Sequence, residues 1–176
     1  MHKKIIAGVM SILICTAALT PDTGVLNQYS ADTAVAVENE NAAPLITAIP
    51  ADEDIIETVK IGPNINGYIY SNGLLRIHGY GLMDSSTKCP FKNAELVTQI
   101  LFENEDPDNG RTIDEIGSYT FNGFKNLNAS SCDDITKTEA GVLVIPDSVT
   151  IIGSHSFDGC SSVKEIKLGN RLECFI

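Results

Sequence analysis

Two segments near the end of the chain repeat one another at a spacing of 23 residues. They are Ile145–Ile152 (IPDSVTII) and Leu168–Phe175 (LGNRLECF), and their apolar side chains stand at matching positions. A period in the twenties is typical of a solenoid, in which each turn of chain stacks on the one before it. This period therefore predicts a solenoid, and it constrains the fold more than any other feature of the sequence.

An earlier copy of the repeat stands at a different spacing. Thr112–Leu127 (TIDEIGSYTFNGFKNL) aligns with Ser148–Val163 (SVTIIGSHSFDGCSSV) at an offset of 36 residues. The 13 residues in excess of the period fall in the polar run 128–141. Because a solenoid tolerates insertions between its turns, we predict that this run is one inserted loop.

Each turn of a solenoid must direct apolar side chains inward at fixed offsets, because its core lies between successive turns. Glycine is expected where the chain bends, since it adopts positive φ without steric cost. The core and bend positions expected in the later copy are Leu143, Ile145, Val149, Ile152, Gly153, Phe157, Gly159, Cys160 and Val163. Those expected in the earlier copy are Ile116, Gly117, Phe121 and Gly123.

The segment Leu143–Val163 resembles the repeat of the BspA-like leucine-rich repeat proteins, which runs approximately L-x-x-I-x-I-P-x-S-V-x-x-I-G-x-x-A-F-x-G-C-x-x-L. Ser156 replaces the usual Ala and Val163 the usual Leu. The earlier copy departs further, with Phe124 in place of Cys. Asn72–Met83 (NGLLRIHGYGLM) is similar to the strand that often precedes the first repeat, so the resemblance covers roughly residues 66–176.

This resemblance implies a mainly β fold: a right-handed leucine-rich-repeat solenoid with short parallel strands, preceded by a small β-hairpin cap. It also implies a bacterial secreted or cell-surface interaction module for protein binding or adhesion, without enzymatic activity. A repeat motif specifies the fold better than the function, because repeat scaffolds host many ligands. Two alternatives therefore stay open: a secreted hydrolase, or its accessory, that acts on polysaccharides, and a self-assembling structural surface unit.

The chain divides into four parts. Residues 1–36 are predicted to be a signal peptide, because a basic start precedes the uncharged apolar run Ile5–Leu19. Cleavage after Ala36 fits the small-x-small rule, and cleavage near Ala17-Ala18 is the alternative. Residues 37–54 are predicted to be a flexible linker and 55–96 a β cap, whose hairpin has a tight two-residue turn with positive φ at Asn72 and Gly73. Residues 97–176 are predicted to be repeats that are incomplete at the C-terminus.

Charge and motifs exclude several classes of function. The formal net charge of −11 repels phosphate backbones, so we expect no nucleic-acid partner. No membrane span is expected in the mature chain. We find no HExxH, GxSxG, phosphate loop or dinucleotide fingerprint, and we expect no catalytic residue, no cofactor and no metal. The expected partner is a protein, with self-association through the uncapped C-terminal edge as a further expectation.

Individual polar residues have simple interpretations. His155 is expected to be exposed to solvent, and Cys160 to be a small buried apolar residue. The acidic run Glu103–Arg111 lacks the ligand spacing of an EF-hand and is interpreted as a solvated loop. Cys89 and Cys132 are expected in loops, where either a disulfide or free thiols can occur.

Three tyrosines form a tentative ligand face. Tyr68 and Tyr70 are two residues apart on an expected strand, so they share one face, and Tyr80 follows shortly after. Aromatic rings on one face can stack against a ligand. The alternative, which the absence of tryptophan favours, is that these rings pack against the first repeat.

Overall fold

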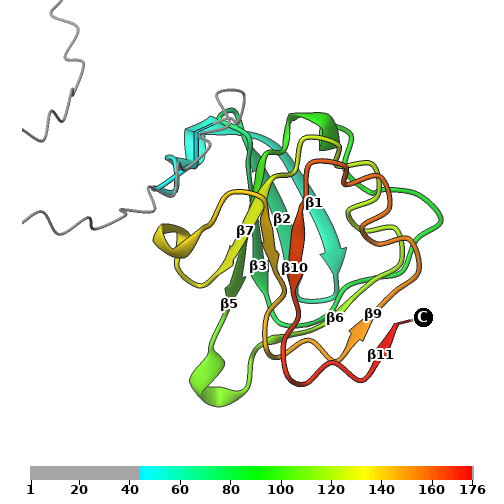
Figure 1. Ribbon diagram of the computed structural model, residues 1–176. Helices are drawn as coiled ribbons and strands as arrows, with labels where there is room; N and C mark the ends of the chain where they lie inside the picture. The colour runs from blue at the N-terminus through cyan, green and yellow to red at the C-terminus, as the bar shows by residue number, and fades with distance from the viewer. Residues whose placement is uncertain (1–43, 176) are drawn as a thin grey trace, which may run out of the picture. The chain divides into compact units, whose positions relative to one another are not determined.

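The computed structural model describes residues 44–175, which are mainly strand with four short 3₁₀ helices (Figure 1). One sheet contains β1 (Ile55–Gly62), β2 (Ile65–Tyr70), β3 (Leu74–Gly79), β5 (Gln99–Asn104) and β7 (Ala129–Cys132). A second contains β4 (Gly81–Leu82), β6 (Ile113–Ile116), β9 (Ile151–Ile152) and β11 (Cys174–Phe175), and a third pairs β8 (Val142–Val144) with β10 (Glu165–Lys167). The 3₁₀ helices are η1 (Asp52–Asp54), η2 (Ala94–Leu96), η3 (Pro107–Asn109) and η4 (Ile135–Lys137).

The chain starts with an antiparallel meander of β1, β2 and β3. The predicted hairpin is confirmed, but its turn differs from the prediction. Only Gly73 in this turn has positive φ (+90°), and its amide donates to the carbonyl of Tyr70 at 3.0 Å. The Asn72 side chain instead accepts the amide of Leu74 at 3.1 Å, so a three-residue loop replaces the expected two-residue turn.

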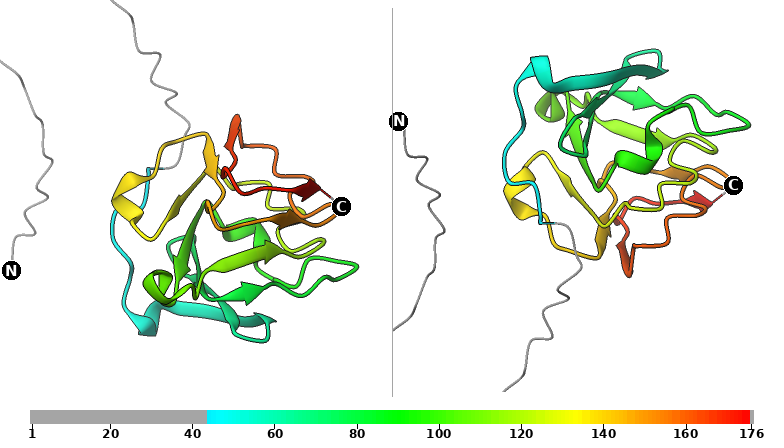
Figure 2. Two further views of the ribbon diagram at one scale, coloured as in Figure 1. Left: turned by 90° about the horizontal axis from the view of Figure 1, so that it is seen from below. Right: turned by 90° about the horizontal axis from the view of Figure 1, so that it is seen from above.

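After β3 every strand pairing is parallel, as predicted. Val142 lies opposite Glu165, and Ile151 lies opposite Cys174, so partners in the last two turns are 23 residues apart. Ile116 and Ile152 are opposite one another at the longer spacing of 36. The spacing of the repeats in the sequence is therefore the same as the spacing between paired residues of neighbouring strands. Figure 2 shows the result: the first strands (cyan to green) and the last ones (orange to red) lie on opposite sides of the fold.

The insertion at 128–141 is not the loop that the sequence predicts. It contains β7, which pairs in parallel with β5, and then η4. On its other side β7 meets β8 through side chains: Ser130 Oγ accepts the amide of Val144 at 2.6 Å and donates to its carbonyl at 2.8 Å, and Cys132 Sγ donates more weakly to the same carbonyl at 4.0 Å. The insertion thus adds a strand to the stack, with buried small residues in place of an apolar alternation.

Most of the expected repeat positions lie in or against one core between the sheets. The buried ones are Ile116, Gly117, Phe121, Leu143, Ile145, Val149 and Ile152, whereas Phe157, Cys160 and Val163 are partly buried and pack against the same core. Phenylalanine rings run through this core. Phe121 stacks on Phe157 at a centroid distance of 5.3 Å and meets Phe102 and Phe124 edge-on at 5.9 and 5.6 Å.

The repeat glycines have two different physical reasons. Gly123 and Gly159 have φ of +80° and +79°, which agrees with their expected place at bends. Gly153 does not have positive φ, so the expected reason is wrong for it. A Cβ on Gly153 would lie 2.5 Å from the Ser118 backbone nitrogen, and one on Gly117 would meet the Asp84 carbonyl oxygen. These two glycines allow the backbones of successive turns to approach closely.

The predicted signal peptide, 1–36, and the first part of the predicted linker lie outside the described residues. The rest of that linker contacts the first sheet, since Ile46 exchanges two hydrogen bonds of 2.9 Å with the side chain of Gln99. Among residues 44–175, no helix has the length and apolar character that crossing a membrane requires.

Candidate functional site

The face of the first sheet that points away from the core carries the most distinctive group of polar side chains. Because side chains alternate along a strand, Leu75 and Ile77 of β3 enter the core while Arg76 and His78 lie on the opposite face. The parallel register sets His78 opposite Glu103, near the end of β5. Three charged or titratable side chains from two strands therefore meet on one face.

Part of this face is covered by an apolar cluster of its own. Tyr70, Leu74, Leu101 and Ile135 are buried in it, and Ile46, Ile55 and Tyr68 pack against it. The side chain of Gln99 holds in place the two segments that cover this face. It bonds Ile46, as described above, and it also donates to Thr138 Oγ1 at 3.0 Å. The covered part of the face is thus closed to a partner, and the part around Glu103 stays accessible.

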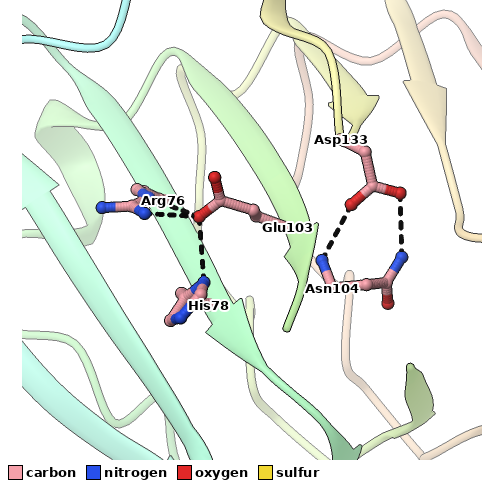
Figure 3. A network of polar contacts seen from close by, with 5 residues as sticks. All are labelled: Arg76, His78, Glu103, Asn104 and Asp133. Carbon is pink, nitrogen blue, oxygen red and sulfur yellow. Dashed lines mark hydrogen bonds and ion pairs between the residues drawn. The ribbon is translucent and has the colours of Figure 1, made fainter. Parts of the chain in front are cut away.

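Glu103 is the centre of the accessible part (Figure 3). Its Oε2 accepts a hydrogen bond of 2.6 Å from Nε of Arg76, forms an ion pair with Nη2 of Arg76 at 2.6 Å, and lies 2.9 Å from Nδ1 of His78. The three side chains are 25% (Arg76), 37% (His78) and 26% (Glu103) exposed. They are therefore fixed in position and still reachable from solvent.

A second polar pair lies beside this cluster. Asp133, which follows β7, accepts the amide of Asn104 at 2.8 Å and its side-chain nitrogen at 2.9 Å (Figure 3). Asp133 holds this position with φ of +58°, a conformation that is uncommon for residues other than glycine. We call Arg76, His78, Glu103, Asn104 and Asp133 together the Glu103 patch.

A shallow groove of about 300 Å³, lined mostly by polar residues, adjoins the patch. Asn104 and Asp133 belong to both, and Asp147 and Arg171 lie along the same groove. Cys132 also lines it, but burial, followed by the charges of Asp133 and Asp147, raises the pKa of this thiol to about 12. The thiol is therefore protonated near neutral pH, and the groove offers charges and hydrogen bonds without a ready nucleophile.

The three tyrosines of the expected ligand face do not form one exposed platform. Tyr70 is fully buried in the apolar cluster that it forms with Leu74, Leu101 and Ile135. Tyr68 shares that cluster and is partly buried. Tyr80 is partly exposed, and the Arg111 guanidinium lies over its ring at 5.2 Å. The alternative interpretation, packing, is the better one for Tyr70, and that residue is withdrawn from the ligand face.

Sequence reasoning missed the Glu103 patch. Arg76 and His78 are two residues apart within a strand, which is a signal that they share a face, but nothing in the sequence marks their partner. Glu103 was expected in a solvated loop, whereas β5 extends through Asn104 and includes it. The rest of that acidic run forms η3 and a turn, closed by a bridge between Asp106 and Arg111.

The other polar candidates have structural surroundings. In residues 44–175 no group of three or more His, Cys, Asp or Glu side chains is arranged to hold a metal ion. Cys89, Cys132, Cys160 and Cys174 are all free thiols, so of the two alternatives for Cys89 and Cys132 the structure has the unpaired one. His155 is exposed, as expected, and stacks on Tyr119 at a centroid distance of 4.9 Å.

Comparison with known proteins finds a known repeat family and a solved protein of similar fold. A family model described as "BspA type Leucine rich repeat region (6 copies)" matches residues 136–175. A solved leucine-rich repeat protein from Eubacterium ventriosum ATCC 27560 is similar in fold, with a TM-score of 0.50 and 21% sequence identity. The match covers 68% of this chain and 27% of that protein, so this chain corresponds to about a quarter of the relative's length. No curated protein matches the chain.

The repeat pattern, the parallel strands in register with it and the family match agree with one another. The match to a leucine-rich repeat family indicates a protein-interaction module. The resemblance noted from the sequence is thereby confirmed for residues 136–175, which match the BspA-type leucine-rich repeat family, and the fold is similar to that of a bacterial leucine-rich repeat protein.

Proposed function

We propose that this chain is a secreted or cell-surface interaction module that binds a protein partner through the Glu103 patch. The observation that supports this most is the combination of rigid positioning and exposure. Arg76, His78 and Glu103 stand on two hydrogen-bonded strands and are each a quarter to somewhat over a third exposed. A charged group that is already ordered before binding loses little side-chain entropy when a partner arrives.

The charges of the patch define the chemistry of the partner. Arg76 can present its remaining guanidinium N–H donors to a carboxylate or a backbone carbonyl. Glu103 and Asp133 can accept from basic side chains or amides of the partner. The adjoining groove extends this polar surface by Asp147 and Arg171. The partner surface is therefore expected to be polar and to carry charges of both signs.

A capture experiment tests this use of the patch. The immobilised protein is exposed to extracellular proteins from the organism's own surroundings, and the retained proteins are identified and quantified. Arg76→Ala is compared with Lys88→Ala, which removes one exposed positive charge from a loop outside the patch. We expect Arg76→Ala to lose a protein that both the wild type and Lys88→Ala retain. Equal retention by all three would contradict a role for the patch.

Export is part of the same proposal and rests on the basic start and the apolar run Ile5–Leu19. We propose that residues 1–36 are removed as a signal peptide, with Val37 as the mature first residue. The intact mass of the protein recovered from culture medium tests this. A mass that corresponds to a start at Val37 supports the proposal, and a mass that includes Met1 would contradict it.

We also propose that the turns form a right-handed leucine-rich-repeat solenoid over 97–176, with 55–96 as its cap and 37–54 as a linker. The 23-residue spacing of strand partners supports this arrangement. An experimental structure of the chain would determine the handedness directly, and a left-handed path from β5 to β6 would contradict the proposal.

A further inference from the structure

Gln99, the first residue of β5, holds another segment of the chain by that segment's backbone. Its Oε1 accepts the amide of Ile46 and its Nε2 donates to the carbonyl of the same residue, both at 2.9 Å. A side-chain amide that bonds both backbone groups of one residue can hold an extended peptide of many different sequences. Gln99 is only 1% exposed, so these two bonds are made at a buried site.

The amide of Gln99 is held in place by residues other than its occupant. Its Nε2 also donates to Thr138 Oγ1 at 3.0 Å. Thr138 Oγ1 in turn lies 2.7 Å from the carbonyl oxygen of Ile135 and 3.1 Å from Ser131 Oγ. Because these contacts do not involve Ile46, the donor and the acceptor of Gln99 keep their positions when another peptide replaces it.

An apolar cluster receives the side chain of Ile46. Its buried members are Tyr70, Leu74, Leu101 and Ile135, and Ile46 packs against them. Figure 2 shows the segment around Ile46 (the first cyan residues) passing beside η4 (yellow), which begins at Ile135. Burial in such a cluster favours a branched aliphatic side chain. We call Tyr70, Leu74, Gln99, Leu101 and Ile135 together the Gln99 site.

The segment that occupies this site has few other attachments. Residues 44–50 have no regular secondary structure, and most of them are exposed. Within the described chain, the two bonds between Ile46 and Gln99 are the only hydrogen bonds that join this segment to residues 51–175. A segment with so few buried contacts and hydrogen bonds opens more readily than the strands beneath it.

The occupant also leaves one buried polar group unsatisfied. The Tyr70 hydroxyl is buried in the cluster, and among residues 44–175 it has no hydrogen-bond partner. The Arg76 guanidinium is near enough to interact with it, but no hydrogen bond of normal geometry joins the two. A buried hydroxyl without a partner is unfavourable. A peptide with a polar group beside its aliphatic residue can supply the bond that residues 44–50 do not.

We propose that the Gln99 site binds an extended peptide segment of a partner protein, and that residues 44–50 occupy the site until that segment replaces them. The partner segment places a branched aliphatic residue where Ile46 lies, and a polar group beside it bonds the Tyr70 hydroxyl. The backbone of the aliphatic residue donates to Gln99 Oε1 and accepts from Gln99 Nε2. The site is separate from the Glu103 patch, and its use does not depend on the function proposed for that patch.

A synthetic peptide of residues 44–51 (PLITAIPA) tests the site, because it carries the segment that already fits. Its binding to the natively processed protein is measured by fluorescence anisotropy. In the wild type the tethered segment competes at an effective concentration on the order of millimolar. Ile46→Asp in the protein should keep that segment out of the site and tighten peptide binding by about tenfold or more. Thr47→Asp, the same charge change at an exposed neighbour, should bind the peptide no better than the wild type.

A second substitution tests the role of the Gln99 amide. Methionine has nearly the volume of glutamine but removes both bonds to the peptide backbone. The double variant Ile46→Asp/Gln99→Met should therefore bind the peptide about tenfold or more weakly than Ile46→Asp. Random peptides selected on Ile46→Asp, with the double variant for counter-selection, should be enriched in a branched aliphatic residue beside a polar one. Circular dichroism checks that each variant is folded.

Amide hydrogen exchange provides a measurement without mutation. The protection of the Ile46 amide in the wild type should fall as the peptide is added in excess, because the peptide displaces residues 44–50. The amide of Gly153, which bonds Ile116 elsewhere in the fold, should keep its protection.

Several outcomes would overturn the proposal: no peptide binding by Ile46→Asp, equal binding by Ile46→Asp and the wild type, binding that Gln99→Met leaves unchanged, no enrichment of an aliphatic residue in the selection, or constant protection of the Ile46 amide. Sedimentation equilibrium separates a partner protein from a second copy of this chain. A wild-type dimer that Ile46→Asp dissociates would assign the site to residues 44–50 of the second copy and would contradict a partner peptide.

Discussion

Phe121 is the side chain on which the stacking of successive turns depends most. It is fully buried, and its ring contacts Phe102 and Phe124 edge-on and Phe157 face-on. Phe102 belongs to β5, and Phe157 lies in the turn after β9, so the ring of Phe121 joins side chains from separate turns. Its removal would leave a cavity between turns that backbone hydrogen bonds hold at a fixed distance from one another, so the turns cannot collapse freely into the cavity.

For Phe121→Ala we expect the free energy of unfolding to fall by about 3 to 5 kcal/mol, the range for a buried phenylalanine whose cavity stays open. Phe157→Ala is the matched comparison, because Phe157 is in the equivalent position of the next turn but only partly buried, with one of these ring contacts. The loss for Phe157→Ala should be smaller by about 1 kcal/mol or more, since part of that side chain is already hydrated.

The assay is equilibrium unfolding in urea, followed by circular dichroism, with the midpoint and the slope fitted for each variant. The slope should stay constant if both variants unfold from the same native state. A loss below about 1 kcal/mol for Phe121→Ala, or a larger loss for Phe157→Ala than for Phe121→Ala, would refute the reasoning. Either result would mean that the core does not run between the turns in this register.

Three further predictions follow from close contacts and burial. Gly153→Ala should lower the free energy of unfolding by about 1 to 3 kcal/mol, because the added Cβ would lie 2.5 Å from a backbone nitrogen of the preceding turn. Gly110→Ala, at an open site with φ of +73°, should lower it by about 1 kcal/mol. Thermal unfolding of both variants compares the two losses. Ser130→Ala removes the two hydrogen bonds of Ser130 to Val144 across the seam between β7 and β8 and should cost about 1 to 3 kcal/mol, with faster amide exchange in β8; unchanged exchange would contradict the bridge. In a thiol-alkylation time course at pH 8, exposed Cys174 should react rapidly, whereas Cys132, whose pKa burial raises to about 12, should react only on unfolding, and equal rates would contradict its burial.

The repeat could be predicted from the sequence because its apolar side chains recur at fixed offsets. The 23-residue spacing between Ile151 and Cys174 is the spacing between strand partners, and so is the 36-residue spacing between Ile116 and Ile152. In both cases the same side chains that make the pattern visible also make the core. Periodicity and register are one constraint in this fold, and one can be inferred from the other.

The added strand could not be predicted in this way. The sequence of β7, Ala-Ser-Ser-Cys, has no apolar alternation, since small side chains fill its positions. Its strand conformation comes from tertiary contacts: backbone pairing with β5 on one side and the Ser130 bridge to Val144 on the other. Local propensity gives no signal of either contact.

The Glu103 patch was also beyond the sequence. His78 and Glu103 are opposite one another because β3 and β5 pair in parallel with an offset of 25 residues, which differs from the 23-residue repeat. An irregular first turn therefore determines which polar side chains meet. Burial in the apolar cluster with Ile135 and Ile46 removes Tyr70, a predicted ligand-binding residue, from the surface. The sequence contains no sign that the segments around Ile46 and Ile135 pack against the first sheet.

The stacking of the turns in register is the central claim, and scalar couplings across hydrogen bonds test it most directly. Such couplings connect the amide nitrogen of one residue with the carbonyl carbon of its hydrogen-bond acceptor in an NMR experiment. Couplings are expected between Glu165 and Gly141, between Glu173 and Thr150, and between Gly153 and Ile116, whose N···O distances are 3.0, 2.9 and 2.8 Å. Detection of these three pairs would establish the register of the last turns. Couplings displaced to neighbouring carbonyls, or pairs joined in antiparallel order, would contradict it.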